Sequence, residues 1–337
     1  MTSQLKLDFV TVDVFTKDTF GGNPLAVFFA LDRQTAPLTT QQMQSIAAEM
    51  NYSETTFVLP PADPANTARI RIFTPKSELP FAGHPNVGTG FVLASYPEAL
   101  PVSGRVELSA AGSEGKQQRL MRFEEQSGLV EVAVTLEGQG RAQEARIAAP
   151  QPFSQRPGHS VQMMAKALGL EENQIVAVPV GSTNAGSTIV SIGIEFPVVE
   201  VSDLAALAAC RPQIETFKQL SLNAQRPDLA AKDIAEAFLV YVYSRTGEGQ
   251  VRGRMFDPLH GIPEDPATGS AAGALAGLLA NQDQVQGVAQ YMISQGEEMG
   301  RPSRITVDVV RDKGQIRQTH ITGCCVEVIQ GTFSLPV

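Results

Sequence analysis

The order of hydrophobic and polar residues along this chain predicts strands and helices mixed together. Residues 7–15 alternate between apolar and polar side chains, as a half-buried strand does. Residues 39–50 place apolar side chains at helical spacing, with Thr39 or Thr40 as a natural N-cap. The same criteria predict strands at 54–60, 68–75, 105–110, 118–125, 129–136, 174–180, 187–194, 236–244 and 251–258, and helices at 158–170 and 201–210.

Two further helical segments, 83–96 and 267–279, consist almost entirely of small and apolar residues. A helix that lacks a polar face must be buried on every side. We therefore expect a curved sheet around each of these central helices. Their glycines and alanines would allow the surrounding strands to approach closely.

The two halves of the chain repeat one order of elements. Residues 41–60 and 161–180 each give an amphipathic helix, a polar break and an apolar strand that ends at or beside a proline. Residues 83–95 and 267–279 each give a small-residue start followed by a short uncharged helix. Because only two copies occur, this order predicts two related domains rather than a solenoid. The polar segment 140–150, which contains glycine and ends with a proline, is the expected boundary.

Composition narrows the range of partners. The chain has 337 residues and a net charge of -9, with no run of Lys or Arg, which argues against a nucleic-acid or anionic-membrane surface. Three cysteines are too few for a disulfide scaffold and are expected to be reduced thiols. We expect a cytoplasmic protein, because neither a signal peptide nor an apolar run of about 18 residues is visible. The histidines lack ligand spacing, so no metal site is expected.

The starts of the two central helices are the first candidates for a site. In one, His84 can act as the N-cap with Pro85 at the first helical position. In the other, either Asp265 or Thr268 can be the cap, and the sequence does not choose between them.

Glycines at these starts favour anion binding. Gly83 and Gly269 leave the backbone N–H groups accessible, and free N–H groups at a helix start bind anions. If the two domains face each other, the two starts would bracket one carboxylate-bearing substrate. The alternative is that both are ordinary capped core helices.

Glu54 and a possible hydrolase triad are two further candidates for catalysis. Glu54 lies at a helix-to-strand transition beside apolar residues, a setting in which a carboxyl group can donate and accept a proton. Its alternative is an ordinary surface acid. Ser270, Asp265 and either His84 or His260 could form a hydrolase triad, but the G-x-S-x-G elbow of such enzymes is absent.

Five segments together resemble the PhzF family, which is named for phenazine biosynthesis. They are "GGNPLAVF", "SETTFVL", "RIFTPKSELPFAGHPNVGTG", "MFDPLHGIPEDPATGSAAG" and "GCCVEVIQGTF", and they run in order over nearly the whole chain. The resemblance implies an α+β, diaminopimelate epimerase-like fold with two pseudo-symmetric domains, each a curved mixed sheet around a central helix. It also implies that the last strand returns to the first domain, which gives 1–145 plus about 326–337 and 146–325.

The resemblance also implies a function and its residues. The family's better-studied enzyme isomerises trans-2,3-dihydro-3-hydroxyanthranilate without a metal or organic cofactor, using a glutamate whose motif matches Glu54. Supporting positions match His84, Asp265 and Ser270, backbone donors match Gly83 and Gly269, and a cleft-lining position matches Asn23. The resemblance further suggests a homodimer.

Related epimerases use a cysteine at each helix start. Neither "AGHPN" nor "PATGS" contains one, which disfavours a two-cysteine racemase mechanism. A protein of the same fold that binds a small anion without chemistry is the alternative function.

Overall fold

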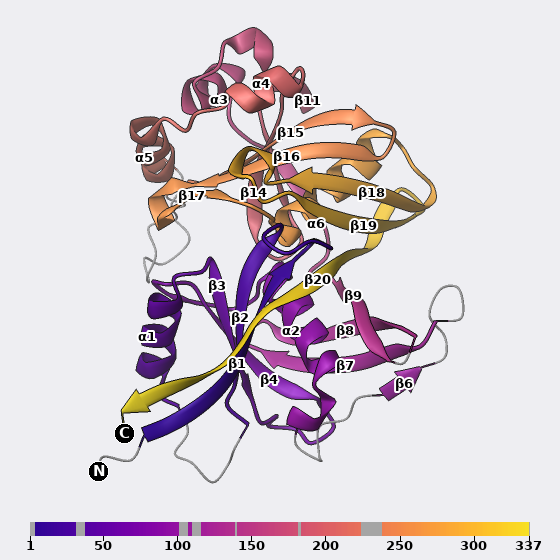
Figure 1. The fold of residues 1–337 in the computed structure, drawn as a ribbon. Helices are drawn as coiled ribbons and strands as arrows, with labels where there is room; N and C mark the ends of the chain where they lie inside the picture. Colours follow the sequence, from indigo (N-terminus) through magenta and orange to yellow (C-terminus); the bar gives the residue numbers. More distant parts are fainter. Residues whose placement is uncertain are drawn as a thin grey trace. The chain divides into compact units, whose positions relative to one another are not determined.

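The computed structural model describes residues 4–31, 38–100, 107–109, 116–138, 140–180, 183–223 and 238–336. The chain divides into two compact units (Figure 1). Unit 1 comprises Met1–Pro150, Ser303–Ile305 and His320–Val337, and unit 2 comprises Gln151–Pro302 and Thr306–Thr319. The chain passes from unit 1 to unit 2 at 150/151, whereas the sequence-based expectation is 145/146. Its last return to unit 1 is at 320, whereas about 326 is expected.

Unit 1 is a closed mixed barrel around one helix. Its elements are β1 (Gln4–Val14), β2 (Asn23–Phe29), α1 (Thr40–Met50), β3 (Glu54–Leu59), β4 (Ala68–Phe73), β5 (Glu78–Leu79), α2 (Gly83–Ser95), β6 (Glu107–Ser109), β7 (Gln118–Glu125), β8 (Gly128–Glu137), β9 (Arg141–Ala148) and the later part of β20 (Gln315–Pro336). Pairing runs β1–β2–β3–β4–β7–β8–β9, with β2–β3 and β4–β7 parallel.

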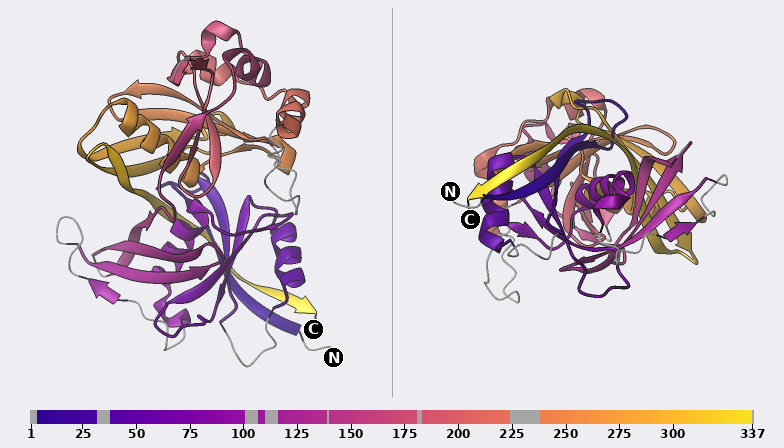
Figure 2. Two further views of the ribbon diagram at one scale, coloured as in Figure 1. Left: turned by 180° about the vertical axis from the view of Figure 1, so that it is seen from behind. Right: turned by 60° about the horizontal axis from the view of Figure 1, so that its bottom comes forward.

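Strand β20 closes this barrel. Its residues His320–Cys324 pair with β9, and Cys325–Pro336 pair with β1. Helix α2 packs against β1, β2, β3, β8 and β9, and every residue from Gly83 to Ala94 is buried. Figure 2 shows this purple helix inside its ring of strands in the right-hand view. The expected sheet around a buried central helix is confirmed.

Helix α1 covers the outside of this barrel. Thr39 is its N-cap and forms a capping box with Gln42, as the first of the two expected caps. Met43, Ile46 and Ala47 turn inward and join an apolar cluster with side chains of β1 to β4. The helix ends at Asn51, which adopts the left-handed conformation and turns the chain directly into β3.

Unit 2 repeats the plan of a central helix with strands around it. Its elements are β10 (Ser154–Pro157), α3 (Val161–Leu168), β11 (Val178–Val180), β12 (Thr183–Ala185), β13 (Thr188–Ser191), β14 (Glu195–Glu200), α4 (Leu204–Ala209), α5 (Ile214–Asn223), β15 (Val240–Gly247), β16 (Gln250–Asp257), β17 (Ile262–Asp265), α6 (Gly269–Gln282) and β18 (Gly287–Gln295). β19 (Ser303–Asp312) and β20 are divided between the units. Helix α6 packs against β13, β14 and β18, with Gly269–Ala280 all buried.

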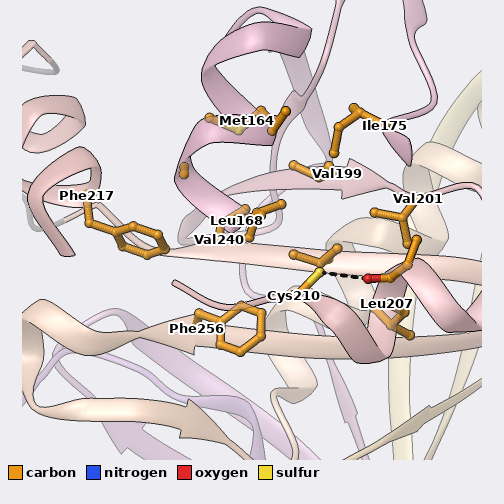
Figure 3. Close-up of a cluster of buried hydrophobic side chains, with 14 of the residues drawn as sticks. Met164, Leu168, Ile175, Val199, Val201, Leu207, Cys210, Phe217, Val240 and Phe256 are labelled. Carbon is orange, nitrogen blue, oxygen red and sulfur yellow. Dashed lines mark hydrogen bonds between the residues drawn. The ribbon is translucent and has the colours of Figure 1, made fainter. Parts of the chain in front are cut away.

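Helices α3, α4 and α5 form an apolar cluster with β14, β15 and β16 (Figure 3). Phe217 of α5, Leu168 of α3 and Val240 of β15 all belong to this cluster. Cys210 at the end of α4 is buried here and donates a weak hydrogen bond to the Ala206 carbonyl, 3.4 Å away. All three cysteines of the chain lie in the described part and are free thiols, as expected.

Some predicted elements differ from the observed ones. The predicted strand 174–180 is a strand only at β11, because the chain first makes a 3-10 turn at Glu172–Gln174. The predicted helix 158–170 is shorter, since Ser160 caps α3 and Gly169 ends it. The strand predicted at 105–110 is described only at β6, and residues 236 and 237 of another also lie outside the described ranges.

Glycines of the central helices lie where the barrel walls are closest. A Cβ at Gly88 would approach Leu25 Cδ2 to 2.6 Å, and one at Gly277 would approach the Phe153 ring to 2.5 Å. Both distances are too short for a real contact, which confirms that small residues let the walls close on the helices.

The Gly277 contact predicts a substitution whose effect changes sign. Gly277→Ala should destabilise unit 2 by about 1–2 kcal/mol, because its methyl group overlaps the Phe153 ring. In a Phe153→Ala background the same change should stabilise by up to about 1 kcal/mol, through the higher helix propensity of alanine. Urea denaturation of the four proteins measures this, and equal effects in both backgrounds would contradict the packing role.

A buried acid in unit 1 makes stability depend on pH. Glu125, at the end of β7, has both carboxylate oxygens buried without a well-aligned hydrogen bond to any described residue. Desolvation raises the pKa of Glu125 to about 8, and the nearby Asn86 amide of α2 opposes this only in part. The folded protein therefore keeps a proton on Glu125 that the unfolded chain releases near pH 4.5.

We expect the free energy of unfolding to fall by about 1.4 kcal/mol per pH unit between pH 5 and 8 on account of this one proton. Above the folded-state pKa the contribution should level off. Glu125→Gln, which is neutral at every pH, should remove this slope. Denaturation at several pH values compares the two proteins, and parallel curves would contradict the prediction.

Candidate functional site

The start of α2 differs from the expected cap. Ala82 is the N-cap, so Gly83 is the first helical residue, His84 the second and Pro85 the third. The prediction of His84 as N-cap is therefore wrong; the imidazole points from within the first turn. Ala82 has no side-chain donor or acceptor, so the N-cap residue itself makes no side-chain capping bond.

Two strands deliver polar side chains to the same edge of the barrel. Asn23 is the first residue of β2 and Glu54 the first of β3. These strands are parallel, with Leu25 opposite Glu54, so both starts lie at one edge. The Ser53 hydroxyl donates to Asn23 Oδ1 at 2.6 Å and links the two starts directly.

His84 lies between these two strand starts. Its Nε2 is 3.4 Å from Glu54 Oε2, without the alignment of a hydrogen bond, and its Nδ1 is 3.4 Å from Asn23 Nδ2. Since Asn23 Oδ1 accepts from Ser53, its amide N–H faces Nδ1. Nδ1 therefore accepts, and the single ring proton lies on Nε2, towards Glu54. Asn23, Glu54 and His84, predicted separately, are brought together.

Burial fixes the charge of this histidine. Desolvation lowers the pKa of His84 to about 3, because a charged imidazolium ring would lose its hydration there. At neutral pH the ring is an uncharged Nε2–H donor. It is therefore a weak base beside the Glu54 carboxyl group.

The start of α6 has the same form in unit 2. Thr268 occupies the N-cap position, Gly269 the first helical position and Ser270 the second. Of the two predicted caps, Thr268 holds the place, but its side chain makes no capping bond. Its hydroxyl instead donates to Asp265 Oδ2 at 2.5 Å. Both central helices thus begin with a Gly and a buried polar residue, after an N-cap residue whose side chain makes no capping bond.

Two further acids close to α6 in the sequence, Glu264 and Asp257, are held by ion pairs within unit 2. Glu264 forms a bidentate ion pair with buried Arg254 at 2.8 Å, and Arg254 also donates to the carbonyls at the end of α4. Glu264 therefore anchors β17, the strand that ends at Asp265. Asp257 is bonded to His260 at 2.7 Å within one turn.

The predicted site residues are divided between the units. Asn23, Glu54, Gly83 and His84 belong to unit 1, whereas Asp265, Gly269 and Ser270 belong to unit 2. Within the described ranges no group of three or more His, Cys, Asp or Glu is arranged to hold a metal ion. None of the helices described is long and apolar enough to cross a membrane.

The model of the PhzC-PhzF family, described as "Phenazine biosynthesis-like protein", matches residues 12–331. The chain belongs to this family. It is 34% identical over 330 residues to the trans-2,3-dihydro-3-hydroxyanthranilate isomerase of Pseudomonas chlororaphis, with 97% of this chain and 99% of that protein covered. It is 36% identical over 297 residues to the enzyme of that name from Pseudomonas aeruginosa, covering 88% of each chain. An uncharacterized isomerase of Mesorhizobium japonicum is 35% identical over 329 residues, covering 96% of this chain and 97% of that one.

Solved structures confirm the predicted α+β, epimerase-like fold. The PhzF-family phenazine biosynthesis protein of Bacillus anthracis matches with a TM-score of 0.75 at 23% identity, covering 99% of this chain and 100% of that one. The hydroxyproline epimerase of Agrobacterium vitis matches with a TM-score of 0.64 at 12% identity, covering 100% and 95%. The chain thus shares its fold with this epimerase, and the three relatives named above are called isomerases.

The contacts of His84 predict its protonation state. Because its pKa is lowered to about 3, the ring should remain the neutral Nε2–H form from pH 5 to 8. Asn23→Asp would place a carboxylate beside Nδ1, which should move the ring proton to Nδ1 and raise the pKa of His84. ¹⁵N NMR of the imidazole distinguishes these forms, with His159 of unit 2 as an internal control. Titration of wild-type His84 near pH 6.5 would contradict the assignment.

Proposed function

We propose that this family member is a cofactor-independent isomerase or epimerase in which Glu54 transfers a proton on a small carboxylate-bearing metabolite. A substrate similar to trans-2,3-dihydro-3-hydroxyanthranilate is the expected class, from the names of its relatives. The observation that carries the proposal is the contact between Glu54 and the neutral His84 at the uncapped start of α2.

The relative base strengths favour Glu54 as the group that moves the proton. With its pKa lowered to about 3, His84 is a poor general base at neutral pH. The Glu54 carboxyl group is 14% exposed, so it is sheltered but not sealed from a ligand. Its 3.4 Å distance from His84 without alignment is typical of a catalytic contact that tightens only when substrate binds.

The helix starts supply the complementary role. Moving a proton between carbons passes through an electron-rich, enol-like state, which backbone N–H donors stabilise. The uncapped N–H groups beginning at Gly83 and Gly269 fit that role and the binding of a carboxylate. One such donor is worth roughly 10²–10³ in rate, and general acid–base transfer roughly 10²–10⁴.

Asp265 and Ser270 then support binding and proton relay in unit 2. The Thr268 hydroxyl donates to the Asp265 carboxylate, which suits a residue that holds or relays a proton rather than one that orients a histidine. His260 is bonded to Asp257 instead, which disfavours a Ser270 hydrolase triad built on His260.

Replacing Glu54 tests the proposal. With trans-2,3-dihydro-3-hydroxyanthranilate as the probe in D₂O, the wild type should isomerise the probe and incorporate deuterium. Glu54→Gln keeps the shape but removes the base, so the rate should fall by about 10²–10⁴. Glu49→Gln, on the exposed face of α1, is the matched control and should retain full activity.

Deuterium uptake that is equal in wild type and Glu54→Gln would overturn the role of Glu54. Tight binding of the probe without isomerisation or exchange by the wild type would favour the alternative of a non-catalytic anion-binding protein.

A further inference from the structure

Gln295, the last residue of β18, is completely buried beside the segment that carries Asp265. Its Nε2 donates to the Asp265 carbonyl at 2.7 Å and to Thr268 Oγ1 at 3.1 Å. Its Oε1 accepts from the Thr268 N–H at 3.2 Å and from the Tyr241 hydroxyl at 3.0 Å. These bonds use both donors and both lone pairs of the amide.

Two of these partners fix the orientation of the amide. The Thr268 N–H can only donate and the Asp265 carbonyl can only accept. Oε1 must therefore face Thr268 N, and Nε2 must face the Asp265 carbonyl. The two hydroxyl groups have no choice left: that of Tyr241 donates to Oε1, and that of Thr268 accepts from Nε2.

The last hydrogen bond in this series, which runs from Tyr241 through Gln295 and Thr268, reaches the Asp265 carboxylate. Because Thr268 Oγ1 accepts from Gln295, its only proton is directed to Asp265 Oδ2, 2.5 Å away. Burial raises the pKa of Tyr241 far above its ordinary range, so its hydroxyl stays a donor at every relevant pH. The donor and the acceptor of each hydrogen bond in this series, from Tyr241 to Asp265, are thus fixed.

The residue after Gln295 holds the same segment through its backbone. Gly296 has a φ of +83°, and a Cβ there would lie 2.3 Å from the Arg301 carbonyl and 2.7 Å from the Pro266 carbonyl. Only glycine permits this close approach. The Gln295 side chain therefore bonds to the Asp265–Thr268 segment, and the Gly296 backbone packs closely against it.

We propose that Gln295 is a positioning residue that, through Thr268, sets the direction and ionised state of the Asp265 carboxylate before α6. This inference rests on the proposed function, in which Asp265 supports binding or proton relay. Gln295 itself touches only protein groups. It acts by presenting Asp265 as a hydrogen-bond acceptor and by leaving Thr268 unable to cap the helix start, where Gly269 stands.

Titration of Asp265 without substrate tests the positioning directly. In protein labelled with ¹³C at the aspartate carboxyl carbons, the Asp265 signal is assigned by its absence from Asp265→Asn. Thr268→Val removes the hydroxyl donor at constant shape, and its titration midpoint should rise by about one pH unit. Thr268→Ser keeps the donor and should restore the wild-type midpoint.

Gln295→Met should raise the midpoint in the same direction, because Thr268 loses the donor that orients it. Gln290→Met is the control: Gln290 lies on the same strand and is bonded to Asp308. All variants keep the other ionisable groups near this hydrogen-bond series, which are Glu297 and the Arg254–Glu264 pair. If Gln295→Met does not fold, the Thr268 pair still decides the test.

A midpoint in Thr268→Val equal to that of wild type would overturn the proposal. With the probe substrate, kcat of Thr268→Val should fall by up to about 100-fold with little change in KM, and Thr268→Ser should recover it. Because the titration needs no substrate, a shifted midpoint in a protein without isomerase activity would support the positioning while refuting the proposed function.

Discussion

Burial of an uncapped helix start is the constraint on which the rest of this structure depends. Helices α2 and α6 are buried along nearly their whole length, yet the N-cap residue of neither helix makes a side-chain capping bond. Buried backbone donors without partners are costly, and natural helices almost always satisfy them. A bound anion satisfies them as well as a cap does. In the proposed function, the substrate carboxylate takes this role at the two helix starts.

The same burial decides the charges around the starts. A barrel wall that closes on α2 excludes water from His84, which keeps the imidazole neutral and makes it a donor rather than a base. In unit 2 the corresponding position holds Ser270, whose hydroxyl is uncharged at neutral pH. In the proposed function, the proton-transferring groups must then lie outside the helices. Glu54 at the start of β3 and Asp265 at the end of β17 are the acids supplied there.

Local patterns predicted the elements well but not the long-range pairing. The uncharged segments at 83–96 and 267–279 predict two buried helices, because a helix buried on every side has few charged residues. No local pattern predicts that β20 closes the barrel, since the pairing of its residues with both β9 and β1 depends on register across the whole chain. The cap of α2 was missed because Ala82 has no capping side chain. Gln295 has no local signal at all; only the sheet places it beside Asp265.

The two units share the plan of a central helix with strands around it, but their helix starts carry different side chains, and this difference bears on the proposed mechanism. A racemase that inverts one carbon with two bases needs an equivalent base from each half. Here the second helical positions hold a desolvated imidazole, His84, and a hydroxyl, Ser270, and neither is a strong base at neutral pH. The acids also differ: Glu54 meets an imidazole, whereas Asp265 accepts from a hydroxyl. Such unequal halves suit the proposed role of Glu54, in which one acid both removes and returns the proton.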